Sequence, residues 1–472
     1  MNNLFEGLLK VSVTTNNTTN SKFYPLHADL DKTAFQEKEG PKTGRNAFSP
    51  DFEYKLQDYK VTENLVKVKE KIIRILMVSV EYPPINGGIG RYTYNLTKNL
   101  MKLGCEVYIA CNEKGLGQFG GLSPTNVHNS DVLLKIIDKL HPDIVHVQYE
   151  HGLYGLKLDS INPIKINTNI DLFYEQCNTP IVTTFHSTYN FKQWLSRVEV
   201  IKLAGQTSNL GILMEYWRHL LNYHSLRTLD RKKLRQSQAG IVFSSYMAKM
   251  IGGGEQIYHG AESASINNTA IAATKQEART IFSLPTDDRR IALAVGFRTG
   301  VKGWDILKKI QIPDRWTIVV NSNSTSEYGL DDKKISLRLE KKKIDDGDDN
   351  LVCLQKGFLN DEQLSLLFYA VDALILPYNL SSGSGVMFDG LAHGLPFVAT
   401  DLPFFKEFAS KGLGIIVKRK PAAFARALKT LDRDFNIYLR EINSFRKKLK
   451  WDFIAMQHVE LYDRVLSSAK NK

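Results

Sequence analysis

The sequence predicts two doubly wound α/β domains, each built on a parallel β-sheet. Residues 72–80 form a nearly continuous apolar run that is stopped by prolines, which is typical of a strand buried on both faces of such a sheet. Strand-like and helix-like segments then alternate along the chain, and a second series of the same kind follows residue 257. The length of 472 residues also exceeds what a single hydrophobic core usually supports.

The first series starts with the strand at 72–80. Residues 85–104 follow it as a glycine-rich turn and an amphipathic helix. We therefore predict a first domain over 72–256, preceded by a polar, partly ordered extension over 1–71. Its further strands are expected at 105–111 and within 131–152, 179–189 and 238–251.

The second series predicts a domain over 257–440. The closing segment, 441–472, contains a long amphipathic helix with no strand after it, and we expect this helix to cross back to the first domain. Ligands of open α/β sheets bind at the carboxyl ends of the strands, so two such domains predict a site between those ends. The strands of this domain are expected at 289–297, 316–323, 350–358, 372–378 and 396–400.

Composition argues against several classes of protein. No run of 18 or more apolar residues is present, and the amino terminus lacks the apolar stretch of a secretory signal. We therefore expect a cytoplasmic protein without a membrane-spanning segment. The cysteines have neither metal-ligand nor redox spacing and are interpreted as buried thiols: Cys105, Cys111, Cys177 and Cys353.

Half of the net charge of +12 lies in one segment, residues 189–236, which carries nine Lys or Arg against three acids. Interleaved aromatics make this segment suited to an anionic membrane surface or a nucleic acid, although no nucleic-acid module accompanies it. A solvated helix pair with snorkelling basic side chains is the open alternative. We predict reversible membrane contact by Trp194 or Trp217, together with Arg231, Lys232, Lys233 and Arg235.

The first of three notable loops is rich in glycine. Gly87, Gly88 and Gly90 lie between a strand and the start of a helix, and Arg91 follows them. Glycine lets an anion approach the free backbone amides of a helix amino terminus. The loop is not the G-x-G-x-x-G dinucleotide fingerprint, and taken alone it also fits an ordinary turn.

The other two loops belong to the second domain. Arg298 and Lys302 follow its first strand, and two cations at that place can chelate a diphosphate, although a solvated turn is the alternative. Asp389, one or two turns into a later helix, can accept hydrogen bonds from ribose hydroxyls. The backbone amides that can cradle a phosphate at the start of this helix are those of Ser382, Gly383, Ser384, Gly385 and Val386.

The order and spacing of these segments resemble the retaining, GT-B-fold nucleotide-sugar glycosyltransferases (glycosyl transferases group 1). This family includes mannosyl- and glucosyltransferases of envelope polysaccharide and glycolipid assembly. The resemblance covers roughly residues 73–472. It is carried by "VSVEYPPINGGIGRYTYNLTKNL", "DIVHVQYEHGLYG", "VTTFHST", "GIVFSSYMAKMI", "IYHG", "VGFRTGVKGWD", "GFLNDEQLSLLFYAVDALILPY" and "FDGLAHGLPFVATDLPFFKEF".

The resemblance implies a donor site. Gly88, with its neighbour Gly87, matches the glycine that meets the donor diphosphate, and Lys302 matches a lysine that binds the same group. The usual arginine position is Phe297, so that Arg298 lies one residue later. The family's two glutamates fall on Ser381, which replaces an acid near the donor sugar, and on Asp389, a shortened acid that would hold the ribose.

The resemblance also implies an acceptor or sugar side. A family histidine aligns with Gln148, and Glu150 and His151 lie just beyond it; Arg91 is placed on the same side. His186 follows a strand and is expected to face the cleft, with a histidine that merely caps a loop as the alternative. With Arg298 and Lys302, it completes the set of candidate catalytic residues.

The implied activity is hexosyl transfer from a nucleoside-diphosphate sugar to a glycan or lipid-linked acceptor, with retention of configuration. Cations and backbone amides would stabilise the departing diphosphate, so we expect neither a metal site nor a cofactor, and no nucleic-acid partner. An inactive nucleotide-sugar-binding protein of the same fold is the main alternative, because of Ser381. A nucleotide-sugar epimerase is a further alternative without visible signatures.

Overall fold

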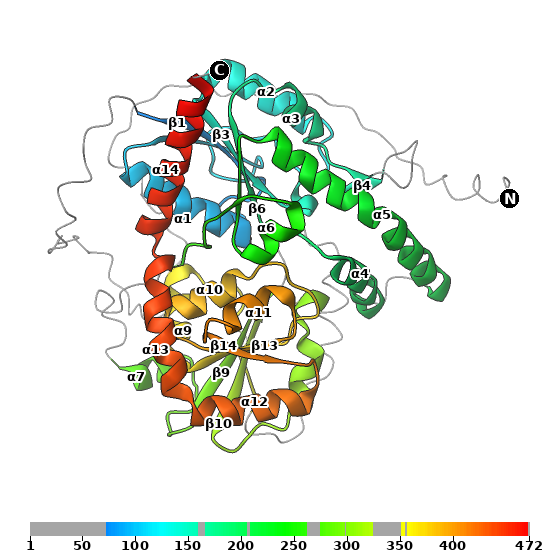
Figure 1. Ribbon diagram of the computed structural model, residues 1–472. Helices are drawn as coiled ribbons and strands as arrows, with labels where there is room; N and C mark the ends of the chain where they lie inside the picture. Colours follow the sequence, from blue (N-terminus) through cyan, green and yellow to red (C-terminus); the bar gives the residue numbers. More distant parts are fainter. Residues whose placement is uncertain are drawn as a thin grey trace, which may run out of the picture. The chain divides into compact units, whose positions relative to one another are not determined.

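The computed structural model describes residues 72–158, 166–204, 208–261, 274–297, 299–323, 351–354 and 356–470, which belong to one compact unit (Figure 1). The predicted extension over 1–71 and the candidate Arg298 lie outside these residues.

The first sheet has six parallel strands in the order β2-β1-β3-β6-β7-β8. Every residue of β3 is buried, as expected for a strand covered on both faces. The chain order reverses between β1 and β3, which makes the carboxyl ends of these two strands the switch point of the sheet. The strands are β1 Arg74–Val78, β2 Glu106–Ala110, β3 Ile144–Tyr149, β6 Ile181–Phe185, β7 Ala239–Val242 and β8 Glu255–Gln256.

Helices connect these strands, as the alternating pattern predicts. A small antiparallel pair, β4 Lys157–Leu158 and β5 Ile166–Asn167, lies outside the main sheet. The helices are α1 Gly88–Lys102, α2 Asn129–Leu140, η2 His151–Tyr154, α3 Asp171–Gln176, α4 Phe191–Ala204, α5 Asn209–Gln236 and α6 Ser245–Ile251.

The second sheet also has six parallel strands, in the order β11-β10-β9-β12-β13-β14. Its switch point lies between β9 and β12. The prediction of two doubly wound parallel-sheet domains is therefore confirmed. The strands are β9 Arg290–Phe297, β10 Trp316–Asn323, β11 Leu351–Leu354, β12 Ala373–Leu376, β13 Phe397–Thr400 and β14 Gly414–Val417.

Most helices of this second region also begin at recognisable signals. Asn360 and Gln363 form a capping box at α9, and proline opens both α11 and α12. The helices are α7 Lys275–Ile281, η4 Gly300–Lys302, η5 Trp304–Lys309, α9 Asp361–Ala370, α10 Gly385–Ala392, α11 Pro403–Ala409, α12 Pro421–Arg433, α13 Phe435–Phe445 and η6 Arg446–Leu449.

The last helix, α14 Trp451–Lys470, packs against α1 of the first domain (Figure 1). It brings the Tyr462 hydroxyl within 2.6 Å of Nδ1 of His146, a fully buried residue of β3. Because His146 also contacts Thr184 at 2.7 Å, its two ring nitrogens both have partners. A polar core of this kind fixes how α14 lies on the sheet.

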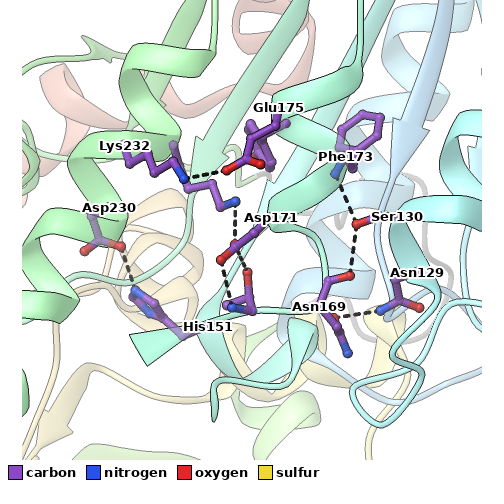
Figure 2. Close-up of polar contacts among 12 residues, drawn as sticks. Asn129, Ser130, His151, Asn169, Asp171, Phe173, Glu175, Asp230 and Lys232 are labelled. Atoms are coloured by element: carbon purple, nitrogen blue, oxygen red, sulfur yellow. Dashed lines mark hydrogen bonds and ion pairs between the residues drawn. The ribbon is translucent and has the colours of Figure 1, made fainter. Parts of the chain in front are cut away.

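The long helix α5 is tied to the first domain by buried charges, some of which appear in Figure 2. Nζ of Lys233 is fully buried and lies 2.6 Å from the carboxylate of Asp171, and Asp230 lies 2.6 Å from His151. Lys232, by contrast, forms an exposed ion pair with Glu175. Buried charges are stable only when paired, so this carboxyl-terminal part of α5 is held firmly.

Two expectations from the sequence are corrected here. Lys233 is fully buried and Trp194 is only 4% exposed, so neither can contact a membrane; both side chains pack inward between α5 and its neighbours. Cys353 is exposed on β11 and Cys177 is half-buried, whereas all four thiols were expected to be buried. A four-residue strand at the edge of a sheet leaves side chains such as Cys353 uncovered.

Candidate functional site

Most of the predicted site residues follow the strands that flank the two switch points, whereas His186 follows β6. Gly87, Gly88 and Arg91 come after β1, and Glu150 comes after β3. Lys302 follows β9, and the loop 381–386 with Asp389 follows β12. These are the places at which doubly wound sheets bind ligands.

The glycine-rich loop at the start of α1 contacts an acidic side chain of the protein itself, Glu81. The carboxylate of Glu81 accepts hydrogen bonds from the backbone of Ile89 and Gly90. A Cβ atom added at Gly87 would lie 2.1 Å from Oε2 of Glu81, so Gly87 is required by a neighbouring side chain. Gly88 has no atom within 4 Å of an added Cβ, so the loop is open at this position.

Lys302 is held beside the start of α10. Its Nζ donates a hydrogen bond of 2.7 Å to the hydroxyl of Tyr378 and lies 4.0 Å from the centre of the same ring. The Tyr378 hydroxyl is 3.5 Å from Oγ of Ser384, the residue that caps α10. Lys302 therefore places a cation close to the helix terminus predicted to receive a phosphate.

The small residues of 381–386 allow close contact with the first domain. Oγ of Ser382 accepts from the backbone of Thr188 at 3.1 Å, and the carbonyl of Ser381 accepts from Gln193 at 2.7 Å. A Cβ atom added at Gly383 would lie 3.2 Å from the carbonyl oxygen of His186. The small side chains therefore allow the two domains to touch. From the sequence, their small size was explained only by the close approach of a phosphate.

The rest of this loop starts α10. Ser384 caps the helix by accepting from the amide of Met387 at 3.2 Å, while Val386 packs against the core. Gly385 lies next to His259: an added Cβ atom would be 3.3 Å from Nε2 of that histidine. The first amides of α10 lack partners within the helix and remain suited to an anion.

Asp389 is buried and forms an ion pair across the two domains. Its Oδ2 lies 2.6 Å from Nη1 of Arg91, while Nε of Arg91 lies 2.5 Å from Asp361. These two carboxylates raise the pKa of Arg91 against the opposing effect of burial. The structure thus joins Asp389, predicted for the ribose, with Arg91, predicted for the acceptor or sugar side.

His186 lies at the end of β6 and is oriented by its neighbours. Its Nε2 is 2.8 Å from Oε1 of Gln148, and its ring meets Tyr92 edge-on at 5.1 Å. Burial, with a smaller effect of His259, lowers the pKa of His186 to about 3, so the imidazole is neutral near pH 7. A neutral imidazole suits hydrogen bonding to a hydroxyl better than charge neutralisation of a diphosphate.

Glu150 and His151 have different environments. The carboxylate of Glu150 caps η2 by accepting from the amide of Gly152, and it accepts from Oγ of Ser187 at 3.1 Å. His151 is buried and bonded to Asp230, and this carboxylate raises the pKa of His151 although burial, the largest influence, opposes it. His151, predicted for the acceptor or sugar side, has a buried ring whose Nδ1 lies 3.4 Å from Oγ of Ser187.

Sequence reasoning missed several residues at this site. Glu81 lies three residues after the end of the first strand, a position that could have drawn attention to it. Gln193 and His259 carry no such signal, because their partners lie far away in the chain. The partners of Glu407 in α11 are also distant in the chain: its carboxylate accepts hydrogen bonds from the amides of Ser245 and Tyr246 at the start of α6, at 3.0 and 2.9 Å.

In the part of the chain that the structure describes, no group of three His, Cys, Asp or Glu residues is arranged to hold a metal ion. Among the same residues, no helix is both long and apolar enough to cross a membrane.

Comparison with known proteins identifies one region directly. Residues 86–253 match the model of glycosyltransferase family 4. This matched region contains the α1 loop, Glu150 and His186. No curated protein sequence matches the chain.

Solved structures of glycosyltransferases share the two-domain fold. Sucrose-phosphate synthase from Thermosynechococcus elongatus is 17% identical with a TM-score of 0.59, over 84% of this chain and 100% of that one. A glycosyltransferase from Rickettsia africae is 15% identical with a TM-score of 0.53, over 84% and 99%. HepE from Anabaena, solved with UDP and glucose, is 14% identical with a TM-score of 0.55, over 83% and 100%. The fold is thus the Rossmann-like GT-B fold of glycosyltransferases.

Proposed function

We propose that the protein is a glycosyltransferase that moves a hexose from a nucleoside-diphosphate sugar to a glycan or lipid-linked acceptor, with retention of configuration. The observation that carries this proposal is the placement of Lys302 and the start of α10 at the switch point of the second sheet, where the loop before α10 lies against the backbone of His186. Solved structures of the same fold hold UDP with glucose, or ADP.

The proposed reaction needs stabilisation of a leaving diphosphate. Negative charge develops on this group as the glycosidic bond breaks, and the Lys302 ammonium and the first amides of α10 lie where they can offset it. Asp389 would accept a hydrogen bond from the ribose with the carboxylate oxygen that Arg91 does not bind. The neutral His186 would bind a sugar hydroxyl.

A panel of nucleoside-diphosphate sugars tests this proposal by thermal shift. A donor present at 100 times its dissociation constant adds about 2.7 kcal/mol to the free energy of unfolding and so raises Tm measurably. Transfer to an acceptor, followed by NMR of the anomeric proton, then reports retention or inversion. If none of the sugars changes Tm, the proposed activity is contradicted.

An inactive nucleotide-sugar-binding protein remains the second candidate, because Ser381 provides a hydroxyl that bonds to the carbonyl of Gly383 at 2.7 Å in place of an acid. The two candidates differ in donor hydrolysis: a transferase slowly releases sugar from its donor, whereas a binding protein leaves the donor intact.

The acceptor side has a surface suited to a membrane. The amino-terminal half of α5 exposes apolar side chains at helical spacing, so that they share one face: Leu210, Leu213, Met214, Trp217 and Leu221. Figure 1 shows this helix beside α4, which it contacts. Leucine, methionine and tryptophan on one helix face are typical of interfacial binding, so we propose that this face contacts the bilayer that would hold a lipid-linked acceptor.

We expect the protein to sediment with anionic vesicles at low salt, and Trp217→Ala to reduce the bound fraction by about tenfold because an exposed anchor is lost. Leu172→Ala removes an equally exposed apolar side chain elsewhere on the domain and serves as the control. High salt should weaken binding, since basic side chains contribute. Equal sedimentation of wild type and Trp217→Ala would contradict the proposed surface.

A further inference from the structure

The carboxylate of Glu81 lies at the amino terminus of α1, in the position that an external anion would take. Its hydrogen bonds from the backbone of Ile89 and Gly90 use amides that a phosphate would otherwise bind. Its contact with Gly87 leaves no room for a side chain there. The protein therefore supplies a negative charge inside its own glycine-rich loop.

The open side of the same loop is Gly88, where an added Cβ atom would meet nothing within 4 Å. The diphosphate of the proposed donor would approach at this place. It would then lie next to a carboxyl group that is only 9% exposed, and when this group is ionised, like charges with little solvent between them repel strongly. This repulsion opposes the attraction that Lys302 and the first amides of α10 offer to the diphosphate, so its removal would strengthen binding.

Among the residues that the structure describes, no cation is close enough to Glu81 to affect its charge. Glu150, at the end of β3, is a second carboxylate that disfavours the charged form of Glu81. Arg91, in the first turn of α1, is engaged by Asp389 and Asp361. Burial, the largest influence, and Glu150 together raise the pKa of Glu81 to about 7, although the two amides oppose this. A proton is therefore available to this side chain near neutral pH.

We propose that Glu81 takes up one proton from solvent when the donor diphosphate binds beside Gly88, and that the resulting carboxylic acid donates a hydrogen bond to a phosphate oxygen. Glu81 is then a donor-binding residue that couples nucleotide affinity to pH. The inference rests on the proposed function, because it takes the ligand to be a diphosphate. Above the pKa of the free protein, affinity should fall by about tenfold for each pH unit.

Calorimetric titration at pH 8 tests the proton uptake, with UDP and ADP as probes. The terminal phosphate of a nucleoside diphosphate is almost fully ionised at this pH, so protons taken up belong to the protein. Measuring the binding enthalpy in two buffers with different ionisation enthalpies gives their number. We expect close to one proton for the wild type and for Glu113→Gln, an exposed control, and none for Glu81→Gln.

Glu81→Gln should also bind UDP about tenfold more tightly than the wild type at pH 8, with little difference at pH 6, because the amide is a neutral hydrogen-bond donor at every pH. Uptake of the same number of protons by Glu81→Gln and wild type would overturn the inference and leave the proposed function standing. Absence of binding by every probe would overturn the proposed function, and the inference with it.

The thermal stability of the ligand-free proteins provides a second test, which also shows whether Glu81→Gln folds normally. Because the folded pKa of Glu81 is raised, wild-type stability should fall as pH rises from about 4.5 to 7, and Glu81→Gln should lack this loss. The variant should therefore have a higher Tm than the wild type at pH 8 and a similar one at pH 5. A lower Tm for the variant at pH 8 would contradict a buried, destabilising charge at Glu81.

Discussion

Lys302→Ala should reduce the rate of sugar transfer by about 10²-fold or more, with a smaller change in donor affinity. The ammonium group lies beside the start of α10, and its electrostatic effect grows as negative charge develops on the leaving diphosphate. Steady-state kinetics with the donor found by the ligand panel would separate kcat from KM.

Two variants control for indirect effects. Lys309→Ala removes an exposed cation from the neighbouring helix η5 and should leave the rate unchanged. Tyr378→Phe keeps the aromatic ring under the Lys302 ammonium but loses the hydroxyl that orients it, so a loss of intermediate size is expected. If Lys302→Ala turns over like wild type, Lys302 does not stabilise the leaving group.

Arg91→Ala should lower the free energy of unfolding by about 3 kcal/mol, because it leaves the buried carboxylate of Asp389 without its cation. This is the lower end of the range for broken buried ion pairs, since a third of the Arg91 side chain is exposed. Chemical denaturation followed by tryptophan fluorescence would measure the change.

The other partner of Arg91 provides a matched control. Asp361 is more than half exposed, so Asp361→Asn should cost less than about 1 kcal/mol. Adding Asp389→Asn to Arg91→Ala should restore part of the lost stability, because the uncompensated charge disappears. Asp389→Asn alone should weaken nucleotide binding by roughly 1.5–3 kcal/mol through the lost charged acceptor. If Arg91→Ala and Asp361→Asn are equally mild, the buried pair contributes little.

Much of the site could be predicted from the sequence, for a local reason. A buried parallel strand is a short apolar run, and the loop at its carboxyl end is the next few residues. Gly88, Lys302 and Asp389 were therefore identified as residues that follow particular strands, and the structure brings these loops to the two switch points. The proposed role in binding a nucleoside diphosphate was suggested by the chemistry of glycine, lysine and aspartate.

The surface of α5 shows where sequence reasoning fails. The basic cluster around Lys232 and the aromatics at Trp194 and Trp217 were treated as one exposed face. Which side of a helix is covered depends on what packs against it, and Asp171 draws Lys233 into the interior. Only Trp217 remains on an apolar face that is open to a bilayer.

The sequence by itself determined the two parallel-sheet domains and the loops proposed to bind the donor, because both follow from the periodicity of neighbouring residues. Only the tertiary structure decided which other residues contact those loops. Arg91 pairs with Asp389, 298 positions away, and Thr188 bonds to Ser382, 194 positions away. Even Glu81, only six residues before Gly87, reaches the loop because the chain turns back after β1. Such contacts depend on which surfaces meet after folding, and local sequence patterns do not predict which surfaces these are.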